Sequence, residues 1–332
     1  MRASVIGLGA FGTALANTLA TRADEVRAWA REPKVVESIN GGRENRAYLP
    51  GVAVSPRVRA MLSLEEALAG AELVVFATPS HATRDVVRKA LPHLREHVPL
   101  LTVAKGIENE TLMTMTQLLE DCLPEQYHPE IAILSGPSFA KEMAAGMPTV
   151  VTIAAHYEKV AQRIQGALQT ESFRTYTSVD VIGVEMGGAL KNVIAIAAGI
   201  ADGLGFGLNA RSAVITRGLA EISRIAVAMG ANPLTLMGLS GLGDLVLTCT
   251  GDLSRNRRVG IELGKGRPLD QILGEMTQVA EGVKTARSAR DLSRKVGVEL
   301  PICDQVHAIM YEGKSARRAL LDLMTRAPKR ED

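Results

Sequence analysis

The first residues with the spacing of a chemical site are three glycines near the start of the chain. Gly7, Gly9 and Gly12 form a G-x-G-x-x-G pattern. They lie between an apolar run, Ser4–Ile6, and a segment of helical composition, Thr13–Leu19. In a dinucleotide site the first glycine permits a tight turn, the second lets a pyrophosphate approach the backbone, and the third lets the helix pack closely on the sheet. An ordinary strand–turn–helix is the alternative, but this context favours a dinucleotide cofactor site.

One residue bears on which dinucleotide is bound. Arg31 lies 19 residues after Gly12, where a site selective for NAD usually carries Asp or Glu to hold the ribose hydroxyls. An arginine can pair with the 2′-phosphate of NADP and stack on adenine, although it can equally be a solvated residue that starts a helix. Glu32 follows it and could hold the ribose hydroxyls of NAD instead, so the sequence allows either cofactor.

Two lysines and an aspartate occur in otherwise apolar surroundings. Lys191 and Asn192 lie inside a segment of small apolar residues, where a lysine needs a partner or a ligand unless it snorkels to the helix rim. Lys105 follows a strand, at the sheet edge where open α/β folds bind ligands, or is a surface lysine before a turn. Asp244 is the one carboxylate of the apolar run Gly241–Cys249. A lysine at the sheet edge can meet a phosphate or a substrate oxygen.

A further cluster could bind an anion. Ser254 is placed to cap a helix, and Arg255 and Asn256 follow it. A helix N-terminus beside a guanidinium group favours a phosphate. Arg257 and Arg258 fit a solvated basic turn, which is the alternative for the whole cluster.

The segments that carry these residues predict two domains of different architecture. Strand-like and helix-like segments alternate in the first half, which predicts a doubly wound parallel sheet. Strand patterns nearly vanish from Val179 onward, so we expect a dinucleotide-binding Rossmann domain over residues 1–178 and an all-helical substrate and catalytic domain over 179–332. Asn40–Gly51 reads as a polar loop. The expected strands are Ser4–Ile6, Glu25–Ala30, Glu72–Ala77, Leu100–Ala104, Ile131–Leu134 and Thr149–Ala154.

Helical periodicity and end signals predict the remaining elements. The expected helices of the first half are Pro33–Asn40, Ser63–Ala69, Thr83–Leu91, Thr111–Cys122 and Tyr157–Leu168. Those of the second half are Val181–Ala201, Ala210–Met229, Ser254–Leu263, Leu269–Met276, Glu281–Val296, Pro301–Tyr311 and Ser315–Thr325. Ser138 is placed to cap another helix and could also donate to a ligand.

Composition excludes several classes of protein. The chain has 332 residues and a net charge of +2, with 3% aromatic residues, which disfavours a nucleic-acid surface. Its three cysteines and six histidines show no metal-ligand spacing. The apolar run Val193–Ile200 is too short to cross a bilayer, which takes about 20 residues, and the start lacks the features of a signal peptide. We therefore expect a cytoplasmic protein without membrane insertion.

Three longer segments carry a resemblance to a known family. Ser135–Glu142, Gly187–Ala210 and Gly241–Gly260 together closely resemble the NAD(P)-dependent glycerol-3-phosphate dehydrogenases of the bacterial soluble type. The resemblance runs from the first glycines to about Thr325. It implies a Rossmann-type α/β domain followed by an all-helical domain like that of 6-phosphogluconate dehydrogenase. It further implies the reduction of dihydroxyacetone phosphate to sn-glycerol 3-phosphate with NADPH/NADP+ or NADH/NAD+, for glycerophospholipid synthesis, without a metal and in a homodimer.

The resemblance also implies roles for single residues. Lys191 matches the lysine that protonates the carbonyl oxygen, and Asp244 matches its acidic partner. Lys105 matches a contact to both cofactor and substrate. The remaining substrate contacts implied are Gly136, Ser138, Asn192, Ser254, Arg255 and Asn256. The remaining cofactor contacts implied are Gly7, Gly9, Ala10, Phe11, Gly12, Arg31, Ala140, Arg255, Val279 and Glu281.

Two other functions fit parts of this pattern. A β-hydroxyacid or 6-phosphogluconate reductase shares the helix with Lys191 and Asn192, but it fits Gly241–Gly260 poorly. A sensor that binds NADP without chemistry has no need of Lys191 and Asp244 in apolar helices.

Overall fold

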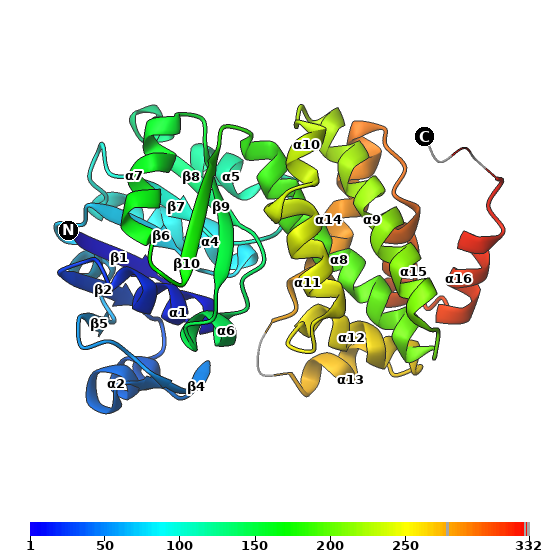
Figure 1. Ribbon diagram of the computed structural model, residues 1–332, viewed down its shortest axis with the longest axis horizontal. Coiled ribbons are helices and arrows are strands. Elements are labelled where there is room, and N and C mark those ends of the chain that lie inside the picture. The colour runs from blue at the N-terminus through cyan, green and yellow to red at the C-terminus, as the bar shows by residue number, and fades with distance from the viewer. Residues whose placement is uncertain (277–278, 329, 331–332) are drawn as a thin grey trace.

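A computed structural model describes residues 1–276, 279–328 and 330. A sheet flanked by helices forms one half of the molecule and a bundle of helices forms the other (Figure 1). The N-terminus lies at the outer end of the sheet half, and the last helix lies at the opposite end of the molecule. The chain crosses between the halves after the last strand, which ends at Ser178.

The sheet has eight strands in the order β10-β9-β8-β7-β6-β1-β2-β5. Each neighbouring pair is parallel except β8 and β9, which are antiparallel. The prediction of a doubly wound sheet is confirmed in its parallel-dominated form, and the six predicted strands are present. Two further strands, β5 and β10, were not predicted. The bounds are β1 Arg2–Ile6, β2 Glu25–Trp29, β5 Val58–Met61, β6 Leu73–Phe76, β7 Leu100–Thr102, β8 Ile131–Ser135, β9 Thr149–Ala155 and β10 Phe173–Ser178.

Successive residues of the central strands supply two separate cores. Val5 and Leu101 face one hydrophobic cluster, and their neighbours Ile6 and Leu100 face another on the opposite side of the sheet. This alternation follows from the two-residue period of a strand, and it explains why these strands are apolar throughout. The covering helices are α1 Ala10–Leu19, α2 Pro33–Gly42, α3 Leu64–Leu68, α4 Ser80–Ala90, α5 Met115–Cys122, α6 Ala140–Ala144 and α7 Glu158–Leu168.

The prediction of a loop over Asn40–Gly51 was wrong. Helix α2 continues to Gly42, and the residues after it form an antiparallel pair, β3 (Glu44–Asn45) and β4 (Leu49–Ala53). The side chain of Asn45 is fully buried against α1. Long-range hydrogen bonds therefore order this polar segment, and no local periodicity signals them.

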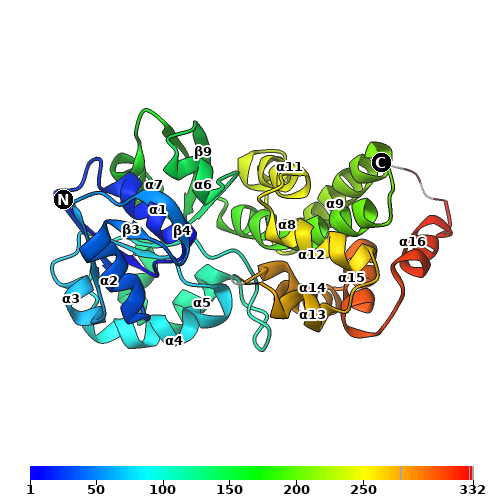
Figure 2. The ribbon, with the colours of Figure 1, turned by 90° about the horizontal axis from the view of Figure 1, so that it is seen from below.

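The helical half is built around α8, which spans Val181–Gly203 and is buried along most of its length. Figures 1 and 2 show it among the other helices of this half. Those are α9 Leu208–Ala228, α10 Pro233–Leu236, α11 Asp244–Thr250, α12 Arg255–Gly264, α13 Leu269–Gly274, α14 Glu281–Val296, α15 Pro301–Tyr311 and α16 Ala316–Met324.

The prediction of an apolar segment too short to cross a membrane was wrong, because Val193–Ile200 is only part of a longer apolar helix. Helix α8 has 23 residues, and Pro233–Thr250 is a second span long and apolar enough to cross a bilayer. However, 89% of the α8 window is buried inside the protein, as expected for the core helix of a globular domain. The second span is divided into α10, a π-turn over Leu239–Gly243, and α11.

Glycines allow α8 and α12 to touch backbone to backbone. A Cβ atom on Gly199 would lie 2.1 Å from the carbonyl oxygen of Arg257, and one on Gly260 would lie 2.1 Å from that of Ile196. One helical turn further on, Gly203 and Gly264 repeat the contact. The two helices thus share the small-xxx-small spacing that permits close helix packing.

Candidate active site

A buried aspartate between two lysines forms the centre of the site. Asp244, at the start of α11, is 1% exposed. Its Oδ1 lies 2.5 Å from Nζ of Lys191 on α8, and its Oδ2 lies 2.7 Å from Nζ of Lys105, which follows β7. The structure therefore brings together three residues that the sequence analysis selected separately, from both halves of the molecule.

The local structure of α11 fixes the aspartate. The π-turn before it packs against Gly187 of α8, where a Cβ atom would lie 2.6 Å from the carbonyl oxygen of Ser240. One turn after Asp244, Thr248 Oγ1 accepts a hydrogen bond from Lys191 Nζ at 2.7 Å and donates one to the Asp244 carbonyl oxygen at 2.6 Å. Thr248 was not predicted from the sequence, although its i+4 spacing from Asp244 places it on the same helix face.

The surroundings of Lys191 change its acidity. Burial lowers the pKa of its ammonium group to about 8, and the positive charge of Lys105 acts in the same direction. Asp244 opposes both effects by stabilising the charged form. A lysine with this pKa can both donate and accept a proton near neutral pH.

Lys105 is also tied to the turn after β8. Its Nζ donates to the carbonyl oxygen of Gly136 at 3.0 Å. Gly136 has a φ of +140°, and a Cβ atom there would lie 2.9 Å from Val151 Cα, so a glycine is required. Ser138 Oγ donates to the same carbonyl oxygen at 2.9 Å. The prediction that Ser138 caps a helix was wrong: α6 begins at Ala140, with Phe139 at its N-cap position.

The predicted anion cluster is ordered at the start of α12. Ser254 caps this helix by accepting from the Arg257 backbone N–H at 3.2 Å. Asn256 Nδ2 donates to Asn192 Oδ1 at 2.9 Å, which places α12 beside the residue that follows Lys191. Arg255 stands exposed at the first position of the helix.

The expectation of a solvated Arg257 was wrong. Its guanidinium group is 12% exposed and pairs with Asp202 and Asp252, each at 2.8 Å. Asp202 also pairs with Arg211 at 2.7 Å. Arg257 therefore links the ends of α8 and α12, whereas Arg258 is exposed as expected.

The glycine-rich turn after β1 fits a dinucleotide phosphate. Gly7 has a φ of +116°, and a Cβ atom there would lie 2.7 Å from the Ala77 carbonyl oxygen. A Cβ atom on Gly12 would lie 1.9 Å from the Gly7 carbonyl oxygen, whereas Gly9 has no atom of the protein within 4 Å of that position. Ala10 and Phe11 begin α1, and no side chain caps it. Open space therefore adjoins a helix N-terminus that is free to receive an anion.

The other predicted cofactor contacts lie around this turn and across the two halves. Arg31 is 81% exposed and pairs with Glu32 at 2.9 Å. Glu281, at the start of α14, accepts from Ser80 Oγ at 2.5 Å and so joins α14 to α4. Ala140 begins α6, and Val279 is exposed shortly before α14.

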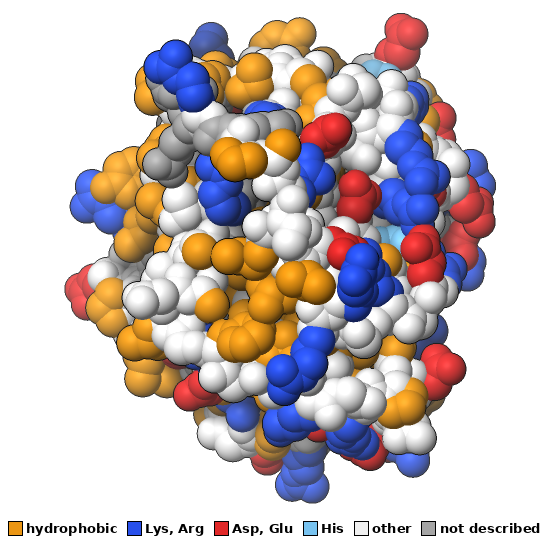
Figure 3. Space-filling view, turned by 90° about the vertical axis from the view of Figure 1, so that its right-hand side faces the viewer, with side chains coloured by type: hydrophobic (Ala, Val, Ile, Leu, Met, Phe, Trp, Pro, Cys, Tyr) orange, Lys and Arg blue, Asp and Glu red, His pale blue; other side chains and the backbone are white. Residues whose placement is uncertain are grey.

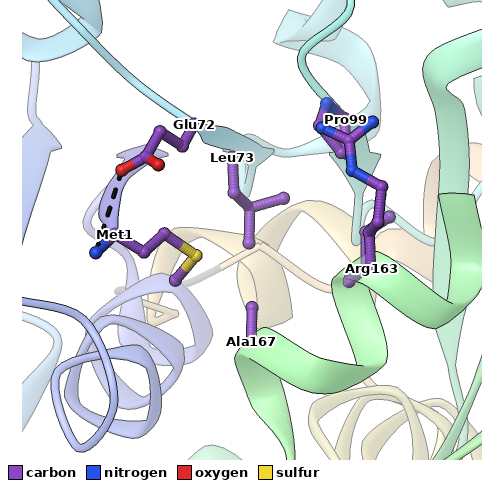
Figure 4. Close-up of a pocket in the computed structure, with 7 residues that line it drawn as sticks. Met1, Glu72, Leu73, Pro99, Arg163 and Ala167 are labelled. Atoms are coloured by element: carbon purple, nitrogen blue, oxygen red, sulfur yellow. Dashed lines mark ion pairs between the residues drawn. The ribbon is translucent and has the colours of Figure 1, made fainter.

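Among residues 1–276, 279–328 and 330, no group of three or more His, Cys, Asp or Glu side chains could hold a metal ion. Figure 4 shows a hollow lined by Met1, Glu72, Leu73, Pro99 and Arg163. The first four lie at or next to the amino ends of β1, β6 and β7, the opposite edge of the sheet from Lys105 and Gly136.

Comparison with known families decides the assignment. Residues 2–161 match the family described as NAD-dependent glycerol-3-phosphate dehydrogenase N-terminus, and residues 180–321 match the corresponding C-terminus. The chain belongs to the NAD-dependent glycerol-3-phosphate dehydrogenase family. The resemblance seen in its sequence is thereby confirmed.

Similar members of the family cover the whole chain. The glycerol-3-phosphate dehydrogenase [NAD(P)+] of Myxococcus xanthus (strain DK1622) is 70% identical over 331 residues, covering 100% of this chain and 99% of the relative. That of Anaeromyxobacter dehalogenans (strain 2CP-C) is 54% identical and covers 100% of both chains. The crystal structure of glycerol-3-phosphate dehydrogenase from Coxiella burnetii superposes with a TM-score of 0.92 at 35% identity, over 98% of this chain and 99% of that chain. The two-part fold is therefore that of this dehydrogenase family.

Proposed function

We propose that this dehydrogenase reduces dihydroxyacetone phosphate to sn-glycerol 3-phosphate with NADPH or NADH, supplying glycerophospholipid synthesis. The observation that carries the proposal is the Lys105–Asp244–Lys191 cluster. It places two ammonium groups beside the carboxyl edge of the sheet, the same edge as the glycine-rich turn. Open α/β sheets bind dinucleotides at this edge.

The nicotinamide, when bound, supplies the hydride. Lys191 then gives a proton from Nζ to the carbonyl oxygen and takes one back in the oxidation. Asp244 holds that ammonium group in place and favours its charged form before the reaction. Lys105 adds positive charge where the alkoxide develops, which lowers the energy of the transition state.

We assign the phosphate of the substrate to the start of α12. The backbone N–H groups there, the Ser254 hydroxyl and the Arg255 guanidinium group are suited to an anion with charge near −2. Asn256 and Asn192 bond to each other, so they can hold the substrate between the phosphate site and Lys191. Gly136 and Ser138 complete the proposed contacts from the sheet half.

For the cofactor, we assign the pyrophosphate to Gly7, Gly9, Gly12 and the start of α1 at Ala10 and Phe11. Arg31 extends from the end of β2 into solvent, where it can meet a 2′-phosphate. The remaining proposed contacts are Lys105, Ala140, Arg255, Val279 and Glu281.

One assay tests the proposal. Purified protein is mixed with dihydroxyacetone phosphate and either NADPH or NADH, and the loss of absorbance of the reduced nucleotide is followed. We expect turnover with this ketone and none with a hydroxyisobutyrate or 6-phosphogluconate substrate in the oxidative direction. Nucleotide binding without turnover of any phosphorylated ketone would instead support a sensor.

We also propose that the enzyme is a cytoplasmic homodimer without membrane insertion, with its cofactor and substrate domains divided after residue 178. What supports the division is that β10 ends at Ser178 and α8 begins at Val181. Figure 3 shows hydrophobic side chains gathered on the end of the helical half. Two exposed hydrophobic residues of α16, the last helix, are Leu321 and Met324. Burying such a surface against a second copy is favourable. Light scattering should give twice the mass of the 35.4 kDa chain.

A further inference from the structure

We propose that Asn45 is a positioning residue for the dinucleotide: it holds the glycine-rich turn in the shape that receives the pyrophosphate. This inference rests on the proposed function, because it assumes that the turn binds the cofactor. Asn45 lies on β3, more than thirty residues beyond the turn in sequence, and none of the contacts assigned above includes it.

The amide of Asn45 is held by hydrogen bonds on both sides. Its Nδ2 donates to the Leu8 carbonyl oxygen and to Thr13 Oγ1, each at 2.8 Å. Its Oδ1 accepts from the Tyr48 backbone N–H at 3.2 Å. The residue is 0% exposed. Both donors and the acceptor are therefore used, which fixes the amide in one orientation.

These bonds reach both ends of the phosphate-binding segment. Leu8 lies between the first two glycines, and Thr13 directly follows the third. Thr13 in turn donates from Oγ1 and from its backbone N–H to the Gly9 carbonyl oxygen, at 2.9 and 3.0 Å. A single side chain thus ties the turn to the first turn of α1.

The bond to Leu8 also sets the direction of a backbone donor. In a trans peptide the carbonyl of one residue and the N–H of the next point in opposite directions. Because the Leu8 carbonyl points to Asn45, the Gly9 N–H points away from the β3–β4 pair. The position of a Cβ atom on Gly9 is open, with no atom within 4 Å. The turn therefore keeps its shape before a phosphate arrives, and binding loses less conformational entropy.

A purely structural role is the alternative, since Asn45 also joins the β3–β4 pair to α1. The chain offers a matched residue for this comparison. Asn17, on α1, donates to the Ala53 carbonyl oxygen at 2.9 Å and accepts from the Ser55 backbone N–H at 3.0 Å. It ties the same segment to the same helix but touches neither Leu8 nor a glycine of the turn.

The test compares Asn45→Leu with Asn17→Leu. Dissociation constants for NADPH and NADH are measured by titration of nucleotide fluorescence without substrate, and thermal unfolding is recorded for each variant. We expect Asn45→Leu to raise the dissociation constants for NADPH and NADH by the same factor, about tenfold. That is the effect expected for the loss of one or two hydrogen bonds. The kcat at saturating cofactor should stay near that of the wild type. Asn17→Leu should lower the melting temperature but leave both dissociation constants within twofold.

Two results would overturn the inference. One is a folded Asn45→Leu variant that binds NADPH as tightly as the wild type does; the other is an Asn17→Leu variant that loses as much affinity for NADPH as Asn45→Leu does. If Asn45→Leu does not fold, Thr13→Val replaces it, because that change removes one acceptor of Asn45 and keeps the volume. Failure of the proposed function is separate, since it would show as wild-type protein that binds NADPH but does not turn over dihydroxyacetone phosphate.

Discussion

At the scale of single residues, Lys191 stands between opposing influences. Burial and Lys105 favour its neutral form, and Asp244 favours its charged form. Lys191 can therefore both lose and regain a proton near neutral pH, which is what its proposed role in proton transfer requires.

We predict that Lys191→Ala lowers kcat by about 10³ or more while the folded protein still binds NADPH, because the change removes both the acid and a charge that stabilises the alkoxide. In the wild type, ketone reduction should fall as pH rises through about 8, since it needs protonated Lys191, and oxidation should rise over the same range. Steady-state rates in both directions measure this. A folded variant that retains a large fraction of kcat would exclude Lys191 as the acid.

A second prediction concerns the choice of cofactor. Arg31→Ala should raise KM for NADPH by about tenfold and leave KM for NADH nearly unchanged, because only NADPH offers a phosphate for a charge-assisted pair. Arg318→Ala is a matched control, since Arg318 is also exposed and paired with one carboxylate, that of Asp322. Equal effects of Arg31→Ala on the two nucleotides would contradict the assignment.

The third prediction concerns the phosphate of the substrate. Arg255→Lys keeps the charge but loses the planar fork of donors, so it should raise KM for dihydroxyacetone phosphate. The dissociation constant for NADPH should change less. Unaltered kinetics with the ketone would remove Arg255 from the phosphate site.

The apolar surroundings of Lys191 and Asp244 made both residues predictable, because buried charges need partners. The partners themselves lie far apart in sequence, so they could not be predicted from the local composition. Arg257 was misjudged because Asp202, which lies on another helix, removes it from solvent. Thr248 was missed because its i+4 spacing from Asp244 indicates a shared helix face but not the contact with Lys191, which lies on another helix.

At the scale of elements, residues at the helix ends were enough to predict both bounds of some helices. Helices α14 and α15 have the predicted bounds, Glu281–Val296 and Pro301–Tyr311. Gly297 ends the first with a φ of +77°, and the second starts with a proline. The β3–β4 pair depends on distant hydrogen bonds instead, and the antiparallel strand β9 has the same local pattern as a parallel one.

The fourth prediction tests the contact of α8 with α12. Gly260→Ala should reduce the free energy of unfolding by about 1–3 kcal/mol, because the added methyl group meets the Ile196 carbonyl oxygen. It should also raise KM for the ketone by moving Asn256 away from Asn192. Gly166→Ala in α7 is the control: it meets no atom within 4 Å, so it should stabilise the protein by up to about 1 kcal/mol. Denaturant unfolding distinguishes the two.

At the scale of the whole molecule, a buried carboxylate joins the two halves away from the site. Glu185 of α8 accepts from the backbone N–H of Thr116 at 2.8 Å and from its hydroxyl at 2.6 Å, at the start of α5. Burial raises the pKa of Glu185, and these donors oppose that shift. The sheet half and the helical half are thus coupled through a helix end.

The fifth prediction follows from this link. Thr116→Val should lower the free energy of unfolding by about 1–3 kcal/mol, since it removes a donor from a buried carboxylate. This loss of stability should grow as pH rises through the pKa of Glu185, because a buried carboxylate is stabilised more by a hydrogen-bond donor than a neutral carboxyl group is. Thr116→Ser keeps the hydroxyl and should stay near the wild type. Calorimetry over a pH series measures the difference, and NADPH binding should not change in either variant.

Helix α8 has a consequence for how this chain can vary in length. Lys191 of this helix contacts Asp244, and Gly199 and Gly203 further along it contact α12. The helix is continuous between these two contacts. Each residue of an α-helix turns the following ones by about 100°. One inserted residue between Asn192 and Gly199 would rotate the glycines away from α12 while the lysine stayed in place. Helix α8 therefore fixes the distance between Lys191 and the start of α12, the proposed proton donor and the proposed phosphate site. Insertions and deletions should be tolerated in the chain's loops but not in this part of the helix.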